Sequence, residues 1–349
     1  YADIVIQGGK VYTMDEKKPY EDTVAIKGDK IVYVGNYAND LIGRDTIVID
    51  AEGKSVLPGF IDTHVHLVGT AFSKFDDLNV FGMHSLHEIL RSIKHIRKPK
   101  GAWIRVGGFD DSMVMEQRYP TRWELDSVSP NNPIIIKRID GHSCIVNTVA
   151  MEKIGLGLET RGVEVNERGL ATGVLRAEAN EIARRFSDYE ASREELLKKL
   201  LEVSYEALKS GVTTIHALEG STGNPSYVKL LMEENLPLDL VIYYQTTNVK
   251  EALALGLPRI GGCILVDGSM DSHTAMFFEP YNDRRDTRGV LYFDESELKN
   301  FILSAHKKGI QIAMHAIGDA AIEQLLNAYE YAIKEQPRED HRHRICLLY

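Results

Sequence analysis

Residues 56–66 read VLPGFIDTHVH, and the expected fold follows from this stretch. A Pro58-Gly59 turn leads into an apolar strand that ends in His64 and His66. Residues i and i+2 of a strand face the same side, so both imidazoles can reach one ion. A neutral imidazole is a good ligand for Zn, Fe, Mn or Ni. The spacing alone does not exclude two ordinary surface or core histidines.

Strands and helices alternate after this stretch. Helical apolar spacing predicts helices over 86–97, 194–209, 296–307 and 320–333. Strands apolar on both faces are expected at 133–139, 211–218, 238–245, 263–267 and 310–316. A glycine follows the predicted helix at Gly211 and at Gly309, where it can act as the C-cap. The pattern predicts an α/β fold of the (β/α)8 TIM-barrel type, whose active sites lie at the carboxyl ends of the strands.

Two further regions depart from this alternation. Residues 1–57 contain short β-branched runs and a Gly28-Asp29 turn, so we expect part of a small β-sandwich there. Residues 58–349 form the barrel domain. Within it, the stretch from about 100 to 185 is rich in Pro, Asn and Arg, and we interpret it as an inserted subdomain that covers the barrel mouth.

Other polar residues follow predicted strands. His315 ends an apolar strand before a Gly318 turn and is expected in the barrel mouth. Candidate substrate-binding residues lie in two polar loops, and ordinary turn chemistry is the alternative for both; they are Asp140, His142, Asp267 and His273. For His216, a packed histidine is favoured over a residue that lines the pocket. A solvated loop is expected for His341 and His343, whose neighbours are charged.

Composition excludes several classes of protein. The chain has 349 residues and a net charge of −10, which makes nucleic acid an unfavourable partner. It contains no apolar run of about 18 or more residues and no charged-then-apolar leader, so neither a membrane span nor a signal peptide is expected. Cys144, Cys263 and Cys346 are interpreted as incidental thiols of a cytoplasmic protein.

The chain resembles the amidohydrolase superfamily along nearly its whole length. The stretch ending in His64 and His66 resembles the first-strand motif of that superfamily. Further motifs resemble the YtcJ-like branch, which includes N-substituted formamide deformylases and proteins named as exoenzyme regulators. These motifs are Pro120-Thr121-Arg122 with Leu125-Asp126, Val128-Ser129-Pro130, Arg138-Ile139-Asp140-Gly141-His142, Thr172-Gly173-Val174-Leu175-Arg176, Gly211-Val212-Thr213-Thr214, Asp267-Gly268-Ser269, Thr274-Ala275, Glu279-Pro280-Tyr281 and His315-Ala316-Ile317-Gly318-Asp319.

The resemblance implies a metal-dependent hydrolase that cleaves a C–N bond of a small molecule, either an amide, a formamide or a cyclic amide. It implies that His64 and His66 bind one metal and that His315 belongs to a second metal position. Zinc, as one or two ions, is the expected cofactor. The expected partner is a small-molecule substrate, and a homodimer is left open.

The chain departs from the family pattern in two places. The family has a lysine, often carboxylated to bridge two metals, in the strand before Asp267. Here Gly262-Cys263-Ile264 has no lysine, and the strand is one residue shorter than in the family pattern. Our hypothesis is that a modified lysine stands between Cys263 and Ile264 and is missing from the sequence. The resemblance also implies a catalytic Asp in later barrel strands. We expect it beyond Tyr349, so no catalytic base is assigned.

Three other functions compete with amide hydrolysis. A phosphotriester or lactone hydrolase would use the same site, because a fold does not fix the substrate. A binding or regulatory protein that has lost catalysis is a second alternative, and it predicts no metal after dialysis. A dinucleotide-binding oxidoreductase is disfavoured, because no GxGxxG stands between a strand and a helix.

Overall fold

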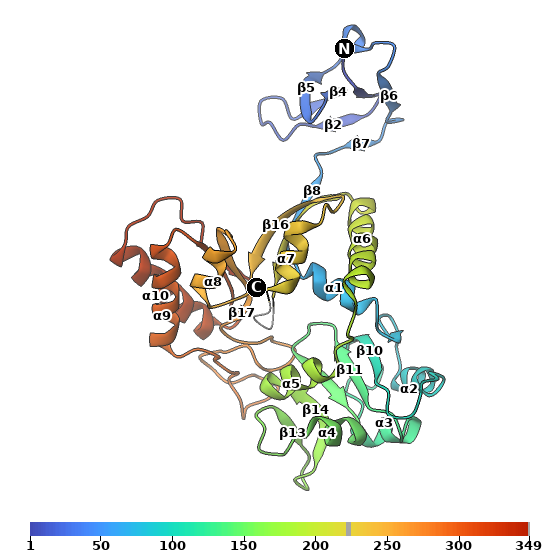
Figure 1. Ribbon diagram of the computed structural model, residues 1–349, viewed down its shortest axis with the longest axis vertical. Coiled ribbons are helices and arrows are strands. Elements are labelled where there is room, and N and C mark those ends of the chain that lie inside the picture. The colour runs from blue at the N-terminus through green and yellow to red at the C-terminus, as the bar shows by residue number, and fades with distance from the viewer. Residues whose placement is uncertain (221–224, 348–349) are drawn as a thin grey trace. The chain divides into compact units, whose positions relative to one another are not determined.

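The computed structural model describes residues 1–220 and 225–347 (Figure 1). The chain divides into two compact units. The first contains Tyr1–Ile61 together with Ser210–Thr214, and the second contains Asp62–Lys209 together with Ile215–Tyr349. The first unit therefore ends inside the β-strand that carries His64, slightly beyond the boundary expected at residue 57.

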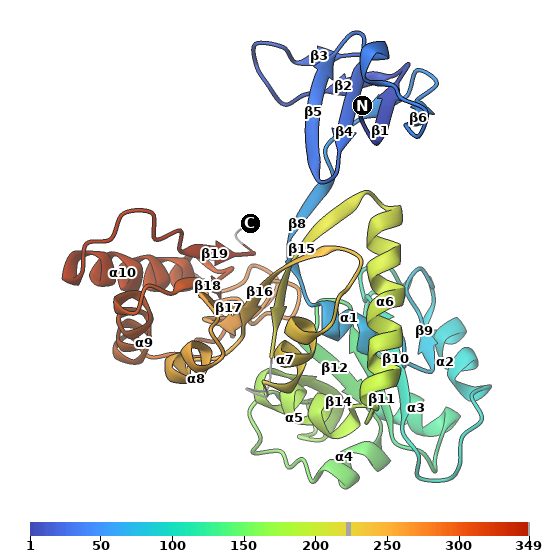
Figure 2. The same ribbon diagram turned by 45° about the horizontal axis from the view of Figure 1, so that its top comes forward.

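The first unit contains two small sheets, in the strand orders β5-β4-β1-β6 and β3-β2-β7 (Figure 2). The strands are β1 (Ile4–Gln7), β2 (Lys10–Tyr12), β3 (Tyr20–Glu21), β4 (Thr23–Lys27), β5 (Lys30–Gly35), β6 (Ile47–Asp50) and β7 (Ser55–Val56), with a short 3-10 helix η1 (Asn39–Leu41). The predicted hairpin is confirmed, because β4 pairs antiparallel with β5 and Lys27 lies opposite Lys30. Val5 and Ala25 are fully buried in a small core.

The second unit contains a six-stranded sheet in the order β19-β18-β17-β16-β15-β8 (Figure 2). Its strands are β8 (Phe60–Val65), β15 (Val212–Glu219), β16 (Asp239–Tyr244), β17 (Arg259–Leu265), β18 (Gln311–His315) and β19 (Arg344–Cys346). The associated helices are α1 (Leu67–Ser73), α6 (Arg193–Lys209), α7 (Ser226–Glu233), α8 (Val249–Ala254), α9 (Glu295–Lys307) and α10 (Asp319–Glu335). Strands β16 to β19 pair in parallel. Within the described ranges, no helix is long and apolar enough to cross a membrane.

This sheet is curled. Strands β8 and β19 stand at its two ends, yet Arg344 of β19 donates a hydrogen bond to the carbonyl oxygen of Thr63 in β8, at 2.8 Å. One arginine side chain therefore spans the two outer strands. The curl brings the carboxyl ends of strands that are distant in sequence toward one another, as the predicted barrel requires.

Burial on both faces explains the apolar strands. In β18, Ile312 and Met314 pack into the main core with residues of α9 and α10, whereas Ala313 packs with Leu218 on the other face. Such strands read as continuous apolar runs because neither face meets water. The helix that precedes β18 ends at Lys307, and Gly309 adopts φ +77°, which a glycine tolerates without steric cost.

A second sheet, also in the second unit, contains most of the predicted insertion. Its strand order is β13-β14-β12-β11-β10-β9. The strands are β9 (Leu78–Asn79), β10 (Ile104–Phe109), β11 (Ile134–Arg138), β12 (Ser143–Val146), β13 (Val163–Val165) and β14 (Ala171–Arg176), and the helices are α2 (Leu86–Lys94), α3 (Arg122–Val128), α4 (Thr148–Ile154) and α5 (Ala177–Ser187). The sheet begins before residue 100, and α2 packs into its core rather than onto the curled sheet. Apolar spacing identifies a helix but does not identify the sheet that it covers.

Residues 341–343 form the predicted loop, but the prediction of a solvated side chain is wrong for His343. The ring of His343 stacks on Tyr329 of α10, with ring centroids 5.1 Å apart. Its Nδ1 accepts a hydrogen bond from the backbone N–H of Ile312, and its Nε2 lies 2.8 Å from Nδ1 of the buried His306. Neighbouring charged residues in the sequence did not reveal these contacts, because their partners come from other elements.

The first turn of α3 is held by hydrogen bonds to one carboxylate, that of Glu124. Glu124 accepts hydrogen bonds from the backbone N–H and the hydroxyl of Thr121 and from the guanidinium of Arg118. The Arg118 hydrogen bonds lower the pKa of Glu124 from 4.5 to about 2. A depressed carboxyl pKa stabilises the fold above the unfolded-state value, and this contribution is lost as the pH falls from about 4.5 toward 2.

We therefore expect Glu124→Gln to lower the free energy of unfolding by up to about 1 kcal/mol at pH 7, since the pair is solvent-screened. The difference from the wild type should shrink as the pH falls toward 2. Urea unfolding at several pH values measures both effects, and Glu152→Gln, an exposed residue of α4, is the control. A pH-independent difference would contradict the role given to Arg118.

Candidate metal centre

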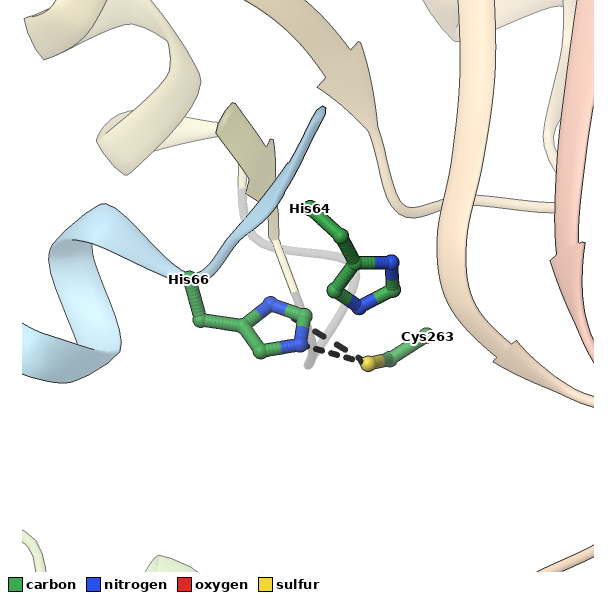
Figure 3. A group of neighbouring side chains, drawn as sticks. All are labelled: His64, His66 and Cys263. Carbon is green, nitrogen blue, oxygen red and sulfur yellow. Dashed lines mark hydrogen bonds between the residues drawn. The ribbon is translucent and has the colours of Figure 1, made fainter. Parts of the chain in front are cut away.

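His64 and His66 lie at the carboxyl end of β8, and their rings converge (Figure 3). The ring centroids are 5.2 Å apart and the ring planes are nearly perpendicular, at 88°. His66 is the residue from which α1 begins. The i, i+2 spacing and the end of the strand thus place both imidazoles in one small region.

A backbone carbonyl sets the orientation of the His66 ring. Nδ1 lies 2.8 Å from the carbonyl oxygen of Leu218 at the end of β15, to which it donates a hydrogen bond. In a neutral imidazole only one nitrogen carries a proton, so Nε2 is unprotonated and has a lone pair that can accept a hydrogen bond or bind a cation. This arrangement is typical of histidine ligands, whose second nitrogen is held by a carbonyl or a carboxylate.

Cys263 of β17 is the third member of this group. Its Sγ lies 2.8 Å from Nε2 of His66, and the ligand atoms of His64, His66 and Cys263 all lie within 4.8 Å of one another (Figure 3). In the part of the chain that the structure describes, no other group of three His, Cys, Asp or Glu residues meets this criterion. From the sequence, Cys263 was interpreted as an incidental thiol, although it lies in the strand where the resemblance implies a metal-bridging lysine.

His315, at the end of β18, stands apart from this three-residue group. Its Nε2 donates a hydrogen bond to the carbonyl oxygen of Gly268 at 2.8 Å, which leaves Nδ1 unprotonated. This Nδ1 atom, like Nδ1 of His64, is buried without a hydrogen-bond partner among the described residues. The His315 ring also lies beside that of His142, with centroids 5.1 Å apart.

These imidazoles are neutral near pH 7. Burial, followed by the neighbouring His66, lowers the pKa of His64 from 6.5 to about 4. Burial also lowers the pKa values of His66 and His315. A neutral imidazole offers a lone pair to a cation, whereas an imidazolium does not. The donor set consists of neutral imidazoles and the sulfur atom of Cys263, and Nδ1 of His64 and Nδ1 of His315 have no hydrogen-bond partner among the described residues. Such a set suits a divalent cation such as zinc.

Glu219 holds the start of α1, two residues after His66, and was also missed. It is buried at the end of β15, and its carboxyl oxygen accepts a hydrogen bond from the backbone N–H of Val68 at the start of α1, at 2.8 Å. Burial raises the pKa of Glu219 to about 8. The available signal in the sequence was a charged residue that ends an otherwise apolar strand.

Among the four candidate substrate-binding residues, His142 lines a cavity. The cavity has a volume of about 280 Å³. His142 lies beside His315, and Ile264 is the residue after Cys263 in β17, so two of the cavity's lining residues neighbour residues of the candidate site. The other lining residues are Ala177, Asn180, Glu181, Leu265, Tyr292 and Phe293.

Asp140 makes contacts within the protein, and its expected contact with substrate stays a prediction. Its carboxylate accepts hydrogen bonds from the hydroxyls of Ser269 and Ser272 and forms an ion pair with Arg138 at 3.1 Å. Ser269 and Ser272 belong to the loop after β17. Asp140 therefore fastens this loop to the second sheet, and its acceptor capacity is used within the protein.

Asp267 and His273 also make contacts within the protein, and their role in substrate binding stays a prediction. Asp267 is fully buried, and its carboxylate accepts hydrogen bonds from the backbone N–H groups of Met276, Ile317 and Gly318. It thus holds the turn after His315 in place. The ring of His273 is engaged within its own loop. Its Nε2 lies 2.8 Å from Asp283, and its ring packs edge-on against Tyr281.

His216 has the packed role that the sequence favoured. Its Nδ1 accepts a hydrogen bond from the guanidinium of Arg344 at 3.0 Å, and its ring lies 5.8 Å from that of Tyr243. Arg344 also donates to the hydroxyl of Tyr243. These contacts account for His216 without a ligand.

The chain is similar in sequence to known amidohydrolases. A sequence model described as "Amidohydrolase family" matches residues 47–346. The chain is 30% identical to the N-substituted formamide deformylase of Arthrobacter pascens, over 97% of this chain and 67% of that protein. It is 29% identical to the putative amidohydrolase YtcJ of Bacillus subtilis (strain 168), over 96% of this chain and 66% of that protein. The resemblance stated from the sequence is confirmed.

A solved structure has a related fold. The uncharacterized metal-dependent hydrolase from Pyrococcus furiosus superposes with a TM-score of 0.65 and 24% identity, over 94% of this chain and 70% of that one. This likeness concerns the fold alone. The chain spans about two thirds of the length of the curated relatives that it matches.

The structural role of Asp267 can be tested by Asp267→Asn. An amide presents one acceptor oxygen where the carboxylate presents two, so at least one buried N–H loses its partner. We expect a loss of about 1–3 kcal/mol in the free energy of unfolding for each unpaired N–H. Denaturant titration measures it, with the exposed Asp286→Asn as the control from the same loop. An unchanged free energy of unfolding would contradict the structural role of Asp267 and favour a role in substrate binding.

Proposed function

Because the chain belongs to the amidohydrolase family, we propose that it catalyses the metal-dependent hydrolysis of a C–N bond in a small molecule. The bond is an amide, a formamide or a cyclic amide. The observation that carries this proposal is the convergence of His64 and His66 at the end of β8, with lone pairs directed to one region. The relative named as an N-substituted formamide deformylase supports the choice of bond.

His64 and His66 are the residues that hold the cation in this proposal, and Nδ1 of His315 is available for a second position. When bound, a zinc ion supplies Lewis acidity, which lowers the pKa of a water molecule and polarises a carbonyl group. The Leu218 carbonyl keeps Nε2 of His66 unprotonated, and Glu219 holds the start of α1 behind it. The expected lysine bridge is not part of the proposal, because β17 contains no lysine.

The cavity beside His142 is the proposed substrate site. Its aliphatic and aromatic lining would exclude water from an apolar substituent, and Asn180, Glu181 and His142 are the lining residues that offer polar contacts. Pockets of this kind bind small molecules through a few placed polar groups in an apolar lining. No residue of the chain is assigned to proton transfer.

The proposed fold of the complete catalytic domain is the eight-stranded barrel. The six strands of the curled sheet and the helices that alternate with them support this proposal. The substrate is a small molecule, and we propose a cytoplasmic location. A homodimer is compatible with the proposal, which does not depend on it.

Metal analysis combined with a substrate panel tests the function. Purified protein should retain about one zinc or more per chain after dialysis and should hydrolyse a member of a formamide and N-acyl amino acid panel, and a chelator should abolish the activity. His64→Ala and His66→Ala should each lower kcat/KM by more than about 100-fold, because even an outer partner of a metal ligand contributes about 10- to 100-fold.

The exposed His87→Ala is the matched control and should behave as the wild type. A protein that keeps no metal after dialysis and hydrolyses nothing in the panel would favour the binding or regulatory alternative. Activity confined to phosphotriesters or lactones would favour the second hydrolase class.

The role of the cavity is tested separately by His142→Ala. This change should raise KM or lower kcat/KM by about tenfold or more, through the loss of a hydrogen bond and of packing against substrate, which together amount to about 1.4 kcal/mol. Zinc content should stay at the wild-type level, because His142 is not in the three-residue group. Loss of zinc in His142→Ala would assign the residue to the metal centre.

A further inference from the structure

Cys263 occupies a position that the proposed function does not use. Its sulfur lies 2.8 Å from the lone-pair nitrogen of His66, and the three ligand atoms of the group lie within 4.8 Å of one another. The Leu218 carbonyl leaves Nε2 as the nitrogen that faces the sulfur. The thiol and the two imidazoles therefore share one centre.

The backbone of β17 is shaped to present this side chain. Gly261 pairs with Ala313 and Leu265 pairs with His315, so four steps along β17 match two steps along β18. Extra residues of this kind form a bulge, which bends the strand and redirects a side chain, and bulges are frequent beside active sites. Cys263 lies within the bulge.

Two contacts hold the bulge in place. Gly262 adopts φ +109°, and a Cβ there would lie 2.5 Å from Cβ of Leu218, so only glycine allows β17 to approach the end of β15 so closely. The side-chain amide of Gln245 donates a hydrogen bond to the carbonyl oxygen of Cys263 at 2.6 Å. The backbone on either side of the Cys263 side chain is thus held by contacts from the ends of β15 and β16.

We infer that Cys263 is a metal ligand, and that this chain holds a zinc ion through two imidazoles and one thiolate in place of a lysine-bridged pair of ions. Three protein ligands with an open fourth position are typical of catalytic zinc sites, whereas structural sites have four. The soft sulfur donor selects zinc over magnesium or manganese. Binding releases the thiol proton to solvent, forms a zinc–sulfur bond and involves no change in oxidation state.

The inference rests on the proposed function only for the presence of a metal at this site, and it is tested by metal binding rather than by hydrolysis. Purified full-length chain is stripped of metal and loaded with Co²⁺. A thiolate ligand should give a sulfur-to-cobalt charge-transfer band in the near ultraviolet. The band should be absent in Cys263→Ser and unchanged in Cys144→Ala, whose buried thiol belongs to the second sheet.

A competition titration with a chelator measures zinc affinity in the same proteins. Cys263→Ser should bind zinc at least about tenfold more weakly than the wild type. A Cys263→Ser protein with the wild-type cobalt spectrum and zinc affinity would overturn the inference, because it would make Cys263 a neighbour of the site and not a ligand.

Alkylation of the wild type gives a measurement that needs no folded variant. Burial raises the pKa of the Cys263 thiol to about 12, so the reaction with iodoacetamide is followed over hours at about pH 8.5, where the metal-free protein forms enough thiolate to be modified. Saturating zinc should slow this modification at least about tenfold, as peptide mass mapping can show. Equal rates with and without zinc would overturn the inference. A cobalt–thiolate band without hydrolysis of any substrate would support Cys263 as a ligand and contradict the proposed function. Hydrolysis without the band would support the proposed function and contradict Cys263 as a ligand.

Discussion

The hydrogen bond from Nδ1 of His66 to the Leu218 carbonyl is the contact on which the candidate site depends. It joins the end of β8 to the end of β15 and determines which nitrogen of His66 keeps its lone pair. Glu219, the next residue of β15, holds the first turn of α1 through Val68. A single strand end therefore fixes both the tautomer of His66 and the direction in which the chain leaves it.

The elements and the two leading histidines could be predicted from sequence because their signals are local. Apolar runs at 211–218 and 310–316 match β15 and β18 closely, and helical spacing over 194–209 matches α6. The i, i+2 rule for His64 and His66 is likewise a property of one strand. The cavity-lining role of His142 and the backbone-holding role of Asp267 could not be separated in this way, since each depends on partners from other elements.

The residues that were missed share one cause. Cys263 looks incidental in sequence, and it becomes notable only when the curl of the sheet and the β17 bulge bring it to His66. His343 lies among charged residues, but it packs against Tyr329 and His306 from two helices. In both cases the side chain's environment is set by tertiary contacts, for which a single sequence carries no periodic signal.

The walls of the cavity come from two different sheets. His142 follows a strand of the second sheet, and Asn180 and Glu181 lie on α5 beside that sheet, whereas Ile264 and Leu265 belong to the curled sheet that carries the candidate metal centre. If the cavity is the substrate site that we propose, one of its walls belongs to a different sheet from His64, His66 and Cys263. Substitutions in the loops and helices of the second sheet can then change the compounds that fit while the candidate metal centre stays the same.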